Sequence, residues 1–231
     1  MNRIDALDWN DIAHQLGSQG NVVLPGLLGR AQCRSLAALM DQSAAADRVT
    51  LDAMDGGRGE LFFLAQPLPE PLAGLRTAFY QRLAPIANRW NEMLDSNERY
   101  LAEFKDFQRQ CRDAGQSRPL SAISRLREAD YQTLHHNADG DCIFPLQLIL
   151  LLSEPEHDFT GGEFVMTEQR PRMQSRPIVL PLRQGDAAII PVAHRPCKGS
   201  NGHYRVRLKH AISRVRSGER IDVELLFHDG L

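Results

Sequence analysis

The chain has 231 residues, of which 42% are hydrophobic and 24% are charged, and its formal net charge is −2. This length suits one domain, or one domain with a helical extension, and the composition is ordinary for a soluble globular protein. The near-neutral balance excludes the overall positive charge of a dedicated nucleic-acid-binding protein. Because no apolar run reaches the roughly 20 residues of a membrane helix, we expect no membrane partner.

The first 120 residues predict mainly helices. Apolar residues recur at helical spacing over residues 9–16 and 30–42, and two longer helices are expected over residues 71–94 and 98–114. Two short segments are strand-like, at residues 21–28 and 61–64. We expect the helices to support one face of a sheet and not to form a separate domain.

From about residue 121 the pattern changes to short apolar segments separated by turn residues. The expected strands cover residues 122–126, 144–152, 163–167, 177–182, 186–192, 204–208 and 221–227. Many short strands of this kind indicate a β-sandwich or jelly-roll barrel. The predicted fold class is therefore α+β, with a jelly-roll core over residues 121–231 and an N-terminal helical buttress over residues 1–120, in a single domain spanning residues 1–231.

The cysteines and the N-terminus bear on the compartment. Four cysteines are scattered along the chain and make no CxxC pair; they are Cys33, Cys111, Cys142 and Cys197. The first residues lack the apolar core of a signal peptide. Both features predict reduced thiols and a cytoplasmic location.

Arginines and lysines recur between Arg170 and Arg220, although the whole chain is slightly acidic. Two interpretations stay open. The run forms a local basic face, or it occupies solvated strand positions of an ordinary charged protein.

Two histidines and an arginine form the most informative pattern. His135 lies just before the expected strand 144–152, His210 lies near the end of another strand, and Arg220 follows ten residues later. Two histidines and one carboxylate, with positions left open, form the metal site of non-haem Fe(II) oxygenases. A guanidinium group binds a carboxylate through two parallel hydrogen bonds. Asn137 stands where such a site normally has its carboxylate.

Other histidines compete for these roles. His194 and His203 are near competitors for the second metal-binding position. His210 is preferred because Arg220, in the element Gly218-x-Arg220, follows it ten residues later. His136 is interpreted as a loop histidine, which is the commoner role of an isolated histidine.

The sequence also carries longer motifs. They lie at residues 83–91, 144–147, 152–155, 158–164, 167–176, 181–186 and 210–218. Through these stretches the chain resembles the 2-oxoglutarate- and Fe(II)-dependent dioxygenase superfamily. Within it, the chain is most similar to a bacterial family described as oxygenases acting on alkylated or damaged DNA.

The resemblance implies a double-stranded β-helix fold and a set of cofactors: Fe(II), 2-oxoglutarate as cosubstrate, and O2. By position, His135 is the first iron ligand, His210 is the distal iron ligand, and Arg220 binds the far carboxylate of 2-oxoglutarate. No catalytic residue beyond the metal site is implied. The implied activity is oxidative hydroxylation or demethylation, with alkylated nucleic-acid bases as one candidate substrate.

Asn137 departs from the family pattern, which has an aspartate there, and several outcomes stay open. Asn137 serves as a weak third ligand, Asp139 or Asp141 restores the carboxylate, or two histidines bind the metal alone, as in iron halogenases. The alternative functions follow from these outcomes. They are a hydroxylase or halogenase-like enzyme of an amino acid, peptide or small metabolite, and a catalytically weakened binding protein.

Overall fold

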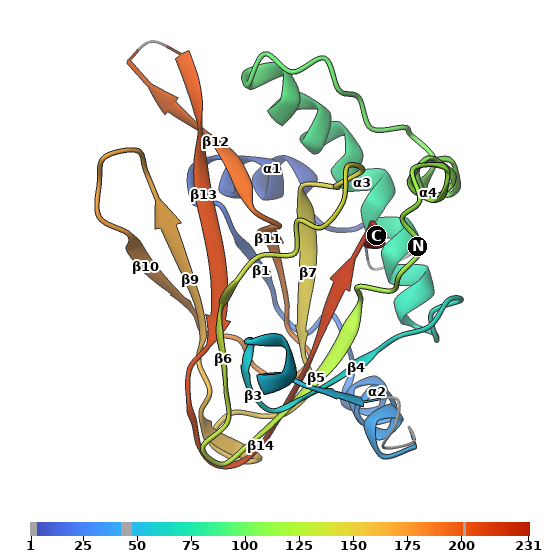
Figure 1. Cartoon of the computed structure of the whole chain (residues 1–231), viewed down its shortest axis with the longest axis vertical. Helices are drawn as coiled ribbons and strands as arrows, with labels where there is room; N and C mark the ends of the chain where they lie inside the picture. Colours follow the sequence, from blue (N-terminus) through green and yellow to red (C-terminus); the bar gives the residue numbers. More distant parts are fainter. Residues whose placement is uncertain (1–3, 43–47, 201) are drawn as a thin grey trace.

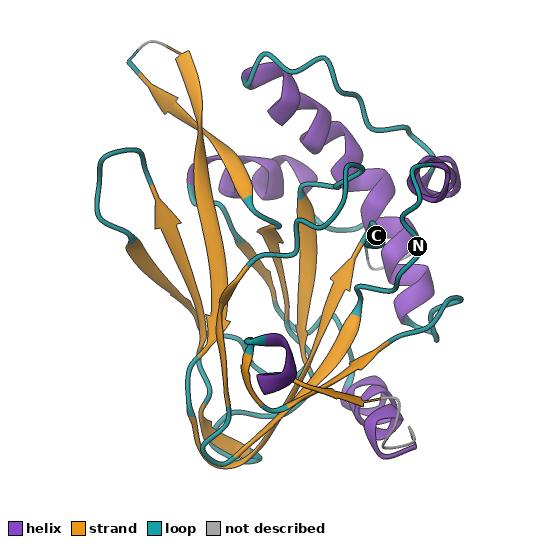
Figure 2. Ribbon diagram, in the orientation of Figure 1, coloured by secondary structure: helices purple, strands orange, loops and turns teal. Residues whose placement is uncertain are grey.

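Two antiparallel β-sheets face each other in the computed structural model, which describes residues 4–42, 48–200 and 202–231 (Figures 1 and 2). The larger sheet has the order β1 (Val22–Leu24), β11 (Ala187–Pro191), β7 (Leu146–Leu151), β14 (Val215–Leu226), β5 (Ala122–Arg127), β4 (Glu60–Phe63) and β2 (Arg48–Thr50), with β8 (Phe159–Gly161) paired to β14. The smaller sheet has the order β10 (Arg176–Leu180), β9 (Phe164–Gln169), β13 (Gly202–Ile212), β6 (Tyr131–His135) and β3 (Gly57–Arg58), with β12 (His194–Gly199) paired to β13.

Helices cover the outer face of the larger sheet (Figure 1). They are α1 (Trp9–Ser18), α2 (Arg30–Gln42), α3 (Leu72–Met93) and α4 (Phe104–Asp113), with a short 3-10 turn, η2 (Asp52–Met54), near β3. Tyr80 of α3 packs its ring against Phe144 and Phe227, with centroids 4.9 and 6.1 Å apart. Aromatic packing of this kind fixes the helices on the sheet.

The larger sheet separates two apolar clusters, and β14 contributes to both sides. Ile221, Val223 and Leu225 belong to the cluster under the helices. Because side chains alternate along a strand, the residues between them face the space between the two sheets. Arg220, Asp222 and Glu224 therefore point into the interior of the barrel. All three are buried.

The expected helices over residues 9–16, 30–42 and 71–94 are confirmed by α1, α2 and α3. The fourth helix begins at Phe104, six residues later than the pattern predicted. Side chains of α3 bind the preceding segment instead: Asn91 Nδ2 donates to the carbonyl of Glu98, and the N–H of Tyr100 donates to Asn88 Oδ1. These bonds satisfy backbone groups that a helix would otherwise use.

The first 120 residues also supply sheet. Strand β1 pairs with β11 at one edge of the larger sheet, β4 and β2 extend the other edge, and β3 pairs with β6. The N-terminal half is thus interleaved with the barrel, and the expected helical buttress describes it incompletely. The coarser fold class holds: helices and antiparallel sheets in one mixed architecture. No helix in the described part of the chain is long and apolar enough to cross a membrane.

Two strands next to the site were not predicted. Strand β6 has the sequence Tyr-Gln-Thr-Leu-His, with one aliphatic residue, and β12 contains Pro196 and ends at Gly199. Strand β6 has too few apolar residues to show an alternating pattern, and proline and glycine, which are uncommon inside strands, hide the pattern of β12. His135 is the last residue of β6.

Candidate metal centre

Three side chains, which we call the trio, meet in the interior between the two sheets: His135, His210 and Glu224. His135 ends β6 and His210 lies opposite it on β13, with ring centroids 4.1 Å apart. Glu224 reaches them from β14 in the facing sheet, with its Oε1 3.2 Å from Nε2 of His210 and 3.4 Å from Nε2 of His135. One possible ligand atom from each residue lies within 4.8 Å of the others. Two imidazoles and a carboxylate are a donor set suited to Fe(II) or Zn(II).

The three side chains differ in exposure. The exposed fractions are 2% for His210, 11% for Glu224 and 25% for His135. Phe164 stacks on the His210 ring at 5.6 Å and closes that side. Solvent and small molecules therefore reach the trio from the His135 side.

The His135 ring has a defined tautomer. Its Nδ1 lies 2.9 Å from the carbonyl oxygen of Thr133, which can only accept a hydrogen bond, so Nδ1 carries the proton. The lone pair of the neutral ring is then on Nε2, the atom that faces Glu224. A backbone carbonyl behind the other ring nitrogen is the usual support of a metal-binding histidine.

Charge within the trio favours an ionised carboxylate. Burial by itself raises the pKa of Glu224, but the nearby His210 and His135 outweigh burial and hold this pKa well below its usual value. Burial likewise lowers the pKa of His135, yet attraction to Glu224 leaves it raised. Burial and the neighbouring His135 lower the pKa of His210. Metal binding requires the ionised carboxylate and both imidazoles in their neutral form, so a metal ion would have to displace the proton that the raised pKa of His135 favours.

Asn137 lies beside the trio. Its Nδ2 is 2.7 Å from Oε2 of Glu224 and 2.8 Å from Oε1 of Gln147. Because an ionised carboxylate only accepts hydrogen bonds, Asn137 presents its amide N–H groups to Glu224. The carbonyl of the Asn137 backbone accepts from Nε2 of His228, 3.0 Å away.

The two aspartates predicted as substitutes lie elsewhere. Asp139 forms an ion pair with Arg118, and both side chains are about half-exposed. Asp141 is exposed, and its backbone N–H donates to Oε1 of Gln116 at 2.9 Å. The structure therefore does not bring either carboxylate to the histidine pair, because the loop turns both toward the surface.

His194 and His203, the competitors for the second histidine position, are exposed on the β12–β13 hairpin. Neither belongs to the described cluster of possible metal ligands. The structure brings His210 to His135.

Glu224 was not among the predicted site residues, although the sequence holds a signal for it. Polar and apolar residues alternate strictly over residues 220–225. Residues four apart on a strand share a face, so placing Arg220 in the site places Glu224 in the same interior. The alternation was interpreted only as a strand.

Arg220 lies in the same interior and is fully buried. Its Nη1 donates to Oδ1 of Asp222 at 2.6 Å, and Ser124 also donates to that carboxylate. Within the described residues, Nε and Nη2 of Arg220 have no hydrogen-bond partner. Arg220 lines a cavity of about 500 Å3 whose wall includes Phe159, Phe164, Leu180 and Leu182. A guanidinium edge that has no hydrogen-bond partner and lies next to a cavity is suited to bind the carboxylate of a ligand.

Residues 59–230 match the family described as "Oxygenase, catalysing oxidative methylation of damaged DNA". The chain belongs to this oxygenase family. Two uncharacterised proteins of Mycobacterium tuberculosis, from strains CDC 1551 and H37Rv, are each 37% identical to it over 163 residues. These matches cover 71% of this chain and 70% of each relative. As an oxygenase, the protein is an oxidoreductase.

Solved structures share the fold of this oxygenase at low identity. A Pseudomonas putida prolyl-4-hydroxylase has a TM-score of 0.57 and 12% identity, covering 96% of this chain and 99% of that chain. A 2OG-Fe(II) oxygenase family oxidoreductase from Burkholderia pseudomallei has a TM-score of 0.54 and 17% identity, covering 97% and 94%. The shared fold agrees with a jelly-roll core.

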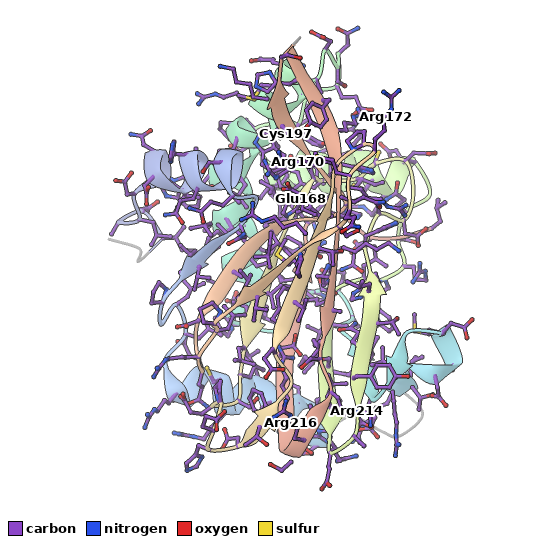
Figure 3. The ribbon with its side chains drawn as sticks, turned by 90° about the vertical axis from the view of Figure 1, so that its left-hand side faces the viewer. Glu168, Arg170, Arg172, Cys197, Arg214 and Arg216 are labelled. Carbon is purple, nitrogen blue, oxygen red and sulfur yellow. The ribbon has the colours of Figure 1, made fainter. Side chains whose placement is uncertain are left out.

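The basic run of this oxygenase does not form one face. Arg170 and Arg195 both donate to the buried carboxylate of Glu168, each through Nε at 3.0 Å. Figure 3 shows Arg170 and Glu168 toward one end of the molecule and Arg214 and Arg216 at the opposite end. The charges of Arg170 and Arg195 are therefore compensated by a buried carboxylate. Arg214 and Arg216 lie at the other end of the molecule.

One part of the run does approach the trio. On β13, Arg205, Arg207 and Lys209 point outward, between residues whose side chains are buried. Nη2 of Arg207 lies 3.2 Å from Nε2 of His136, the neighbour of His135. Burial, Arg207 and Lys209 all lower the pKa of His136. We call Arg205, Arg207 and Lys209 the β13 cationic strip.

Proposed function

We propose that this oxygenase is an Fe(II)- and 2-oxoglutarate-dependent dioxygenase whose metal is held by His135 and His210. The observation that carries the proposal is the convergence of the two Nε2 atoms with a carboxylate oxygen in a buried site. The carbonyl of Thr133 fixes the His135 ring with Nε2 available, and the ring of Phe164 fixes His210. The histidine pair is thus preorganised for a metal ion.

Arg220 is proposed to bind the far carboxylate of 2-oxoglutarate. Asp222 holds Nη1, which leaves the edge formed by Nε and Nη2 for two parallel hydrogen bonds to a second carboxylate. Arg220 and Glu224 share the interior face of β14, so the cosubstrate would extend along this strand between the guanidinium group and the histidine pair. Phe164 lines the cavity at Arg220 and stacks on the His210 ring, so it would contact the methylene carbons of the cosubstrate.

When bound, iron, 2-oxoglutarate and O2 together oxidise a substrate C–H bond to an alcohol, with succinate and carbon dioxide as the other products. On an N-methylated base this alcohol loses formaldehyde, which removes the methyl group. The protein's residues hold the metal, orient the cosubstrate and leave the His135 side open to the substrate.

The proposed substrate class is an alkylated base in single-stranded DNA. The family description names damaged DNA. The β13 cationic strip supports the same class, because its Arg207 contacts His136, next to the most exposed member of the trio. Phosphates of a strand bound there would be attracted to the guanidinium and ammonium groups.

The test has two stages. Anaerobic protein with Fe(II) and 2-oxoglutarate should give the visible absorption band of the chelate. With air and a methylated single-stranded oligonucleotide, it should then release succinate and formaldehyde. The unmethylated oligonucleotide is the control. Succinate without formaldehyde from any methylated strand would reject the DNA substrate, and a folded protein with neither band nor succinate would reject the enzyme activity.

A further inference from the structure

We infer that the third metal-binding side chain is Glu224 on β14, and that Asn137 positions this carboxylate instead of binding the metal. The inference rests on the proposed function in one respect, because it takes His135 and His210 as the other two ligands. It assigns the carboxylate to the strand that carries Arg220 and not to the loop after β6.

The two oxygens of Glu224 have different partners. Oε1 faces both histidines, at 3.2 Å from His210 and 3.4 Å from His135, on the atoms that would bind metal. Oε2 accepts from Asn137 at 2.7 Å. One oxygen is therefore directed at the shared centre of the trio, and the other is fixed by a hydrogen bond, the usual support of a metal-binding carboxylate.

The interior position of Glu224 also calls for a cation. The residue is buried on the interior face of β14, where an unpaired carboxylate is costly. Its ion-pair partners within the described chain are the two imidazoles, whereas the nearest arginine on its own strand, Arg220, is paired with Asp222. A divalent cation between the imidazoles and Oε1 would compensate this charge.

Asn137 and Glu224 are chemically matched. An aspartate at position 137 would place a second carboxylate about where the amide now donates to Oε2, and two carboxylates at that separation repel each other. The amide is neutral and donates, so Glu224 stays ionised and oriented. Positions 137 and 224 together therefore supply one carboxylate. The halogenase-like alternative requires a site without a carboxylate, so this geometry does not support it.

The experiment measures Co(II) binding to the whole protein by titration calorimetry and by the visible ligand-field spectrum of the bound ion. Glu224→Gln keeps the shape of the side chain and removes its charge. It should weaken Co(II) binding by more than the roughly 10–100-fold typical of an outer-shell partner and should change the spectrum. Glu219→Gln is the matched control, because Glu219 lies on the same strand and pairs with Arg127 away from the site. The control should bind Co(II) as the wild type does.

Two further variants test Asn137. Asn137→Ser removes the amide and should weaken Co(II) binding less than Glu224→Gln does. The exchange variant, Asn137→Asp with Glu224→Gln, should bind Co(II) more tightly than Glu224→Gln alone, since it returns one carboxylate to the site. If Asn137→Ser causes the larger loss, or the exchange recovers nothing in a folded protein, the role given to Asn137 is wrong.

The outcomes separate this inference from the proposed function. Failure of the wild type to bind Co(II) at all would overturn both. Loss of binding in His210→Ala together with wild-type affinity in Glu224→Gln would overturn only the assignment of Glu224. Circular dichroism and thermal unfolding of each variant establish that it is folded before its affinity is compared.

Discussion

The loop after β6 and strand β14 both carry acidic or amide residues near the histidine pair, but they position them differently. In the loop, Asp139 and Asp141 turn to the surface, and Asp139 pairs with Arg118. On β14, residues 222–224 pair with β5 on one side and with β7 on the other, so Asp222 and Glu224 are fixed pointing inward. A central strand holds carboxylates in the interior because its ladder leaves no alternative direction. A loop can turn its charges toward water.

The loop and strand β14 both lie next to His135 and His210, so their comparison matters only if these two histidines bind the metal. Replacing His210 with alanine should reduce Co(II) affinity by more than about 100-fold, because it removes a buried donor atom that no neighbour replaces. Titration calorimetry measures the loss. His203→Ala, on the same strand but exposed, should leave the affinity unchanged. Equal losses in the two variants would mean that the metal binds elsewhere on β13.

The next largest effect concerns His228, which follows β14 and connects it to the loop. Its Nδ1 accepts from the N–H of Phe144 and its Nε2 donates to Asn137, so the ring is neutral. Burial lowers the pKa of His228 to about 4, against 6.5 for an ordinary histidine. Between these values the unfolded chain binds a proton that the folded chain does not. The stabilisation is complete above pH 6.5 and is lost as the pH falls toward 4, by about 3 kcal/mol.

Urea unfolding at several pH values measures this loss. His228→Gln cannot titrate and should lose less of its free energy of unfolding between pH 7 and pH 4 than the wild type does. His14→Gln is the control, since His14 is exposed on α1 and the variant should keep the wild-type dependence. An unchanged pH dependence in His228→Gln would show that the connection between loop and strand does not depend on a neutral ring.

A smaller effect tests the other end of β14. Arg220→Lys keeps a positive charge next to Asp222 but loses the planar fork, so it should weaken 2-oxoglutarate binding by about 10-fold, or about 1.4 kcal/mol. Calorimetric titration of 2-oxoglutarate into Co(II)-loaded protein measures the change, and Co(II) affinity itself should stay the same. Arg216→Lys, exposed on the same strand, should show no effect. Wild-type cosubstrate affinity in Arg220→Lys would show that Arg220 does not bind 2-oxoglutarate.

The smallest effects are expected in the loop. Asp139→Ala and Asp141→Ala should leave Co(II) affinity within about two-fold of the wild type and change the free energy of unfolding by less than about 1 kcal/mol. The reason is that an exposed ion pair such as Arg118–Asp139 contributes little. A large loss of metal affinity in either variant would show that the loop after β6 directs a carboxylate at the metal site, contrary to this comparison.

The sequence predicted the parts of this molecule that depend on local pattern. The first three helices follow from apolar spacing, and motif order selected His135 and His210, which the structure brings together, and Arg220; their binding roles stay predictions. The alternation over residues 220–225 places Glu224 on the face of Arg220, but its contact with His135, 89 residues away, depends on how the two sheets face each other. The same limit explains α4, since the segment before it is held by Asn88 and Asn91 of another helix. Contacts between distant segments are not encoded in any one window.

Strand β14 has a consequence for how binding is detected. Its outer face carries part of the main apolar core, and it pairs with β5 over residues 219–224 and with β7 over residues 222–226, so the backbone amides of this stretch should exchange with solvent only when the whole domain unfolds. A ligand held by Arg220 or Glu224 binds the folded domain and not the unfolded chain, so its binding is linked to this global unfolding. Cofactor occupancy should therefore raise the melting temperature of the entire protein, in proportion to the logarithm of ligand concentration, and not merely protect a loop from proteolysis.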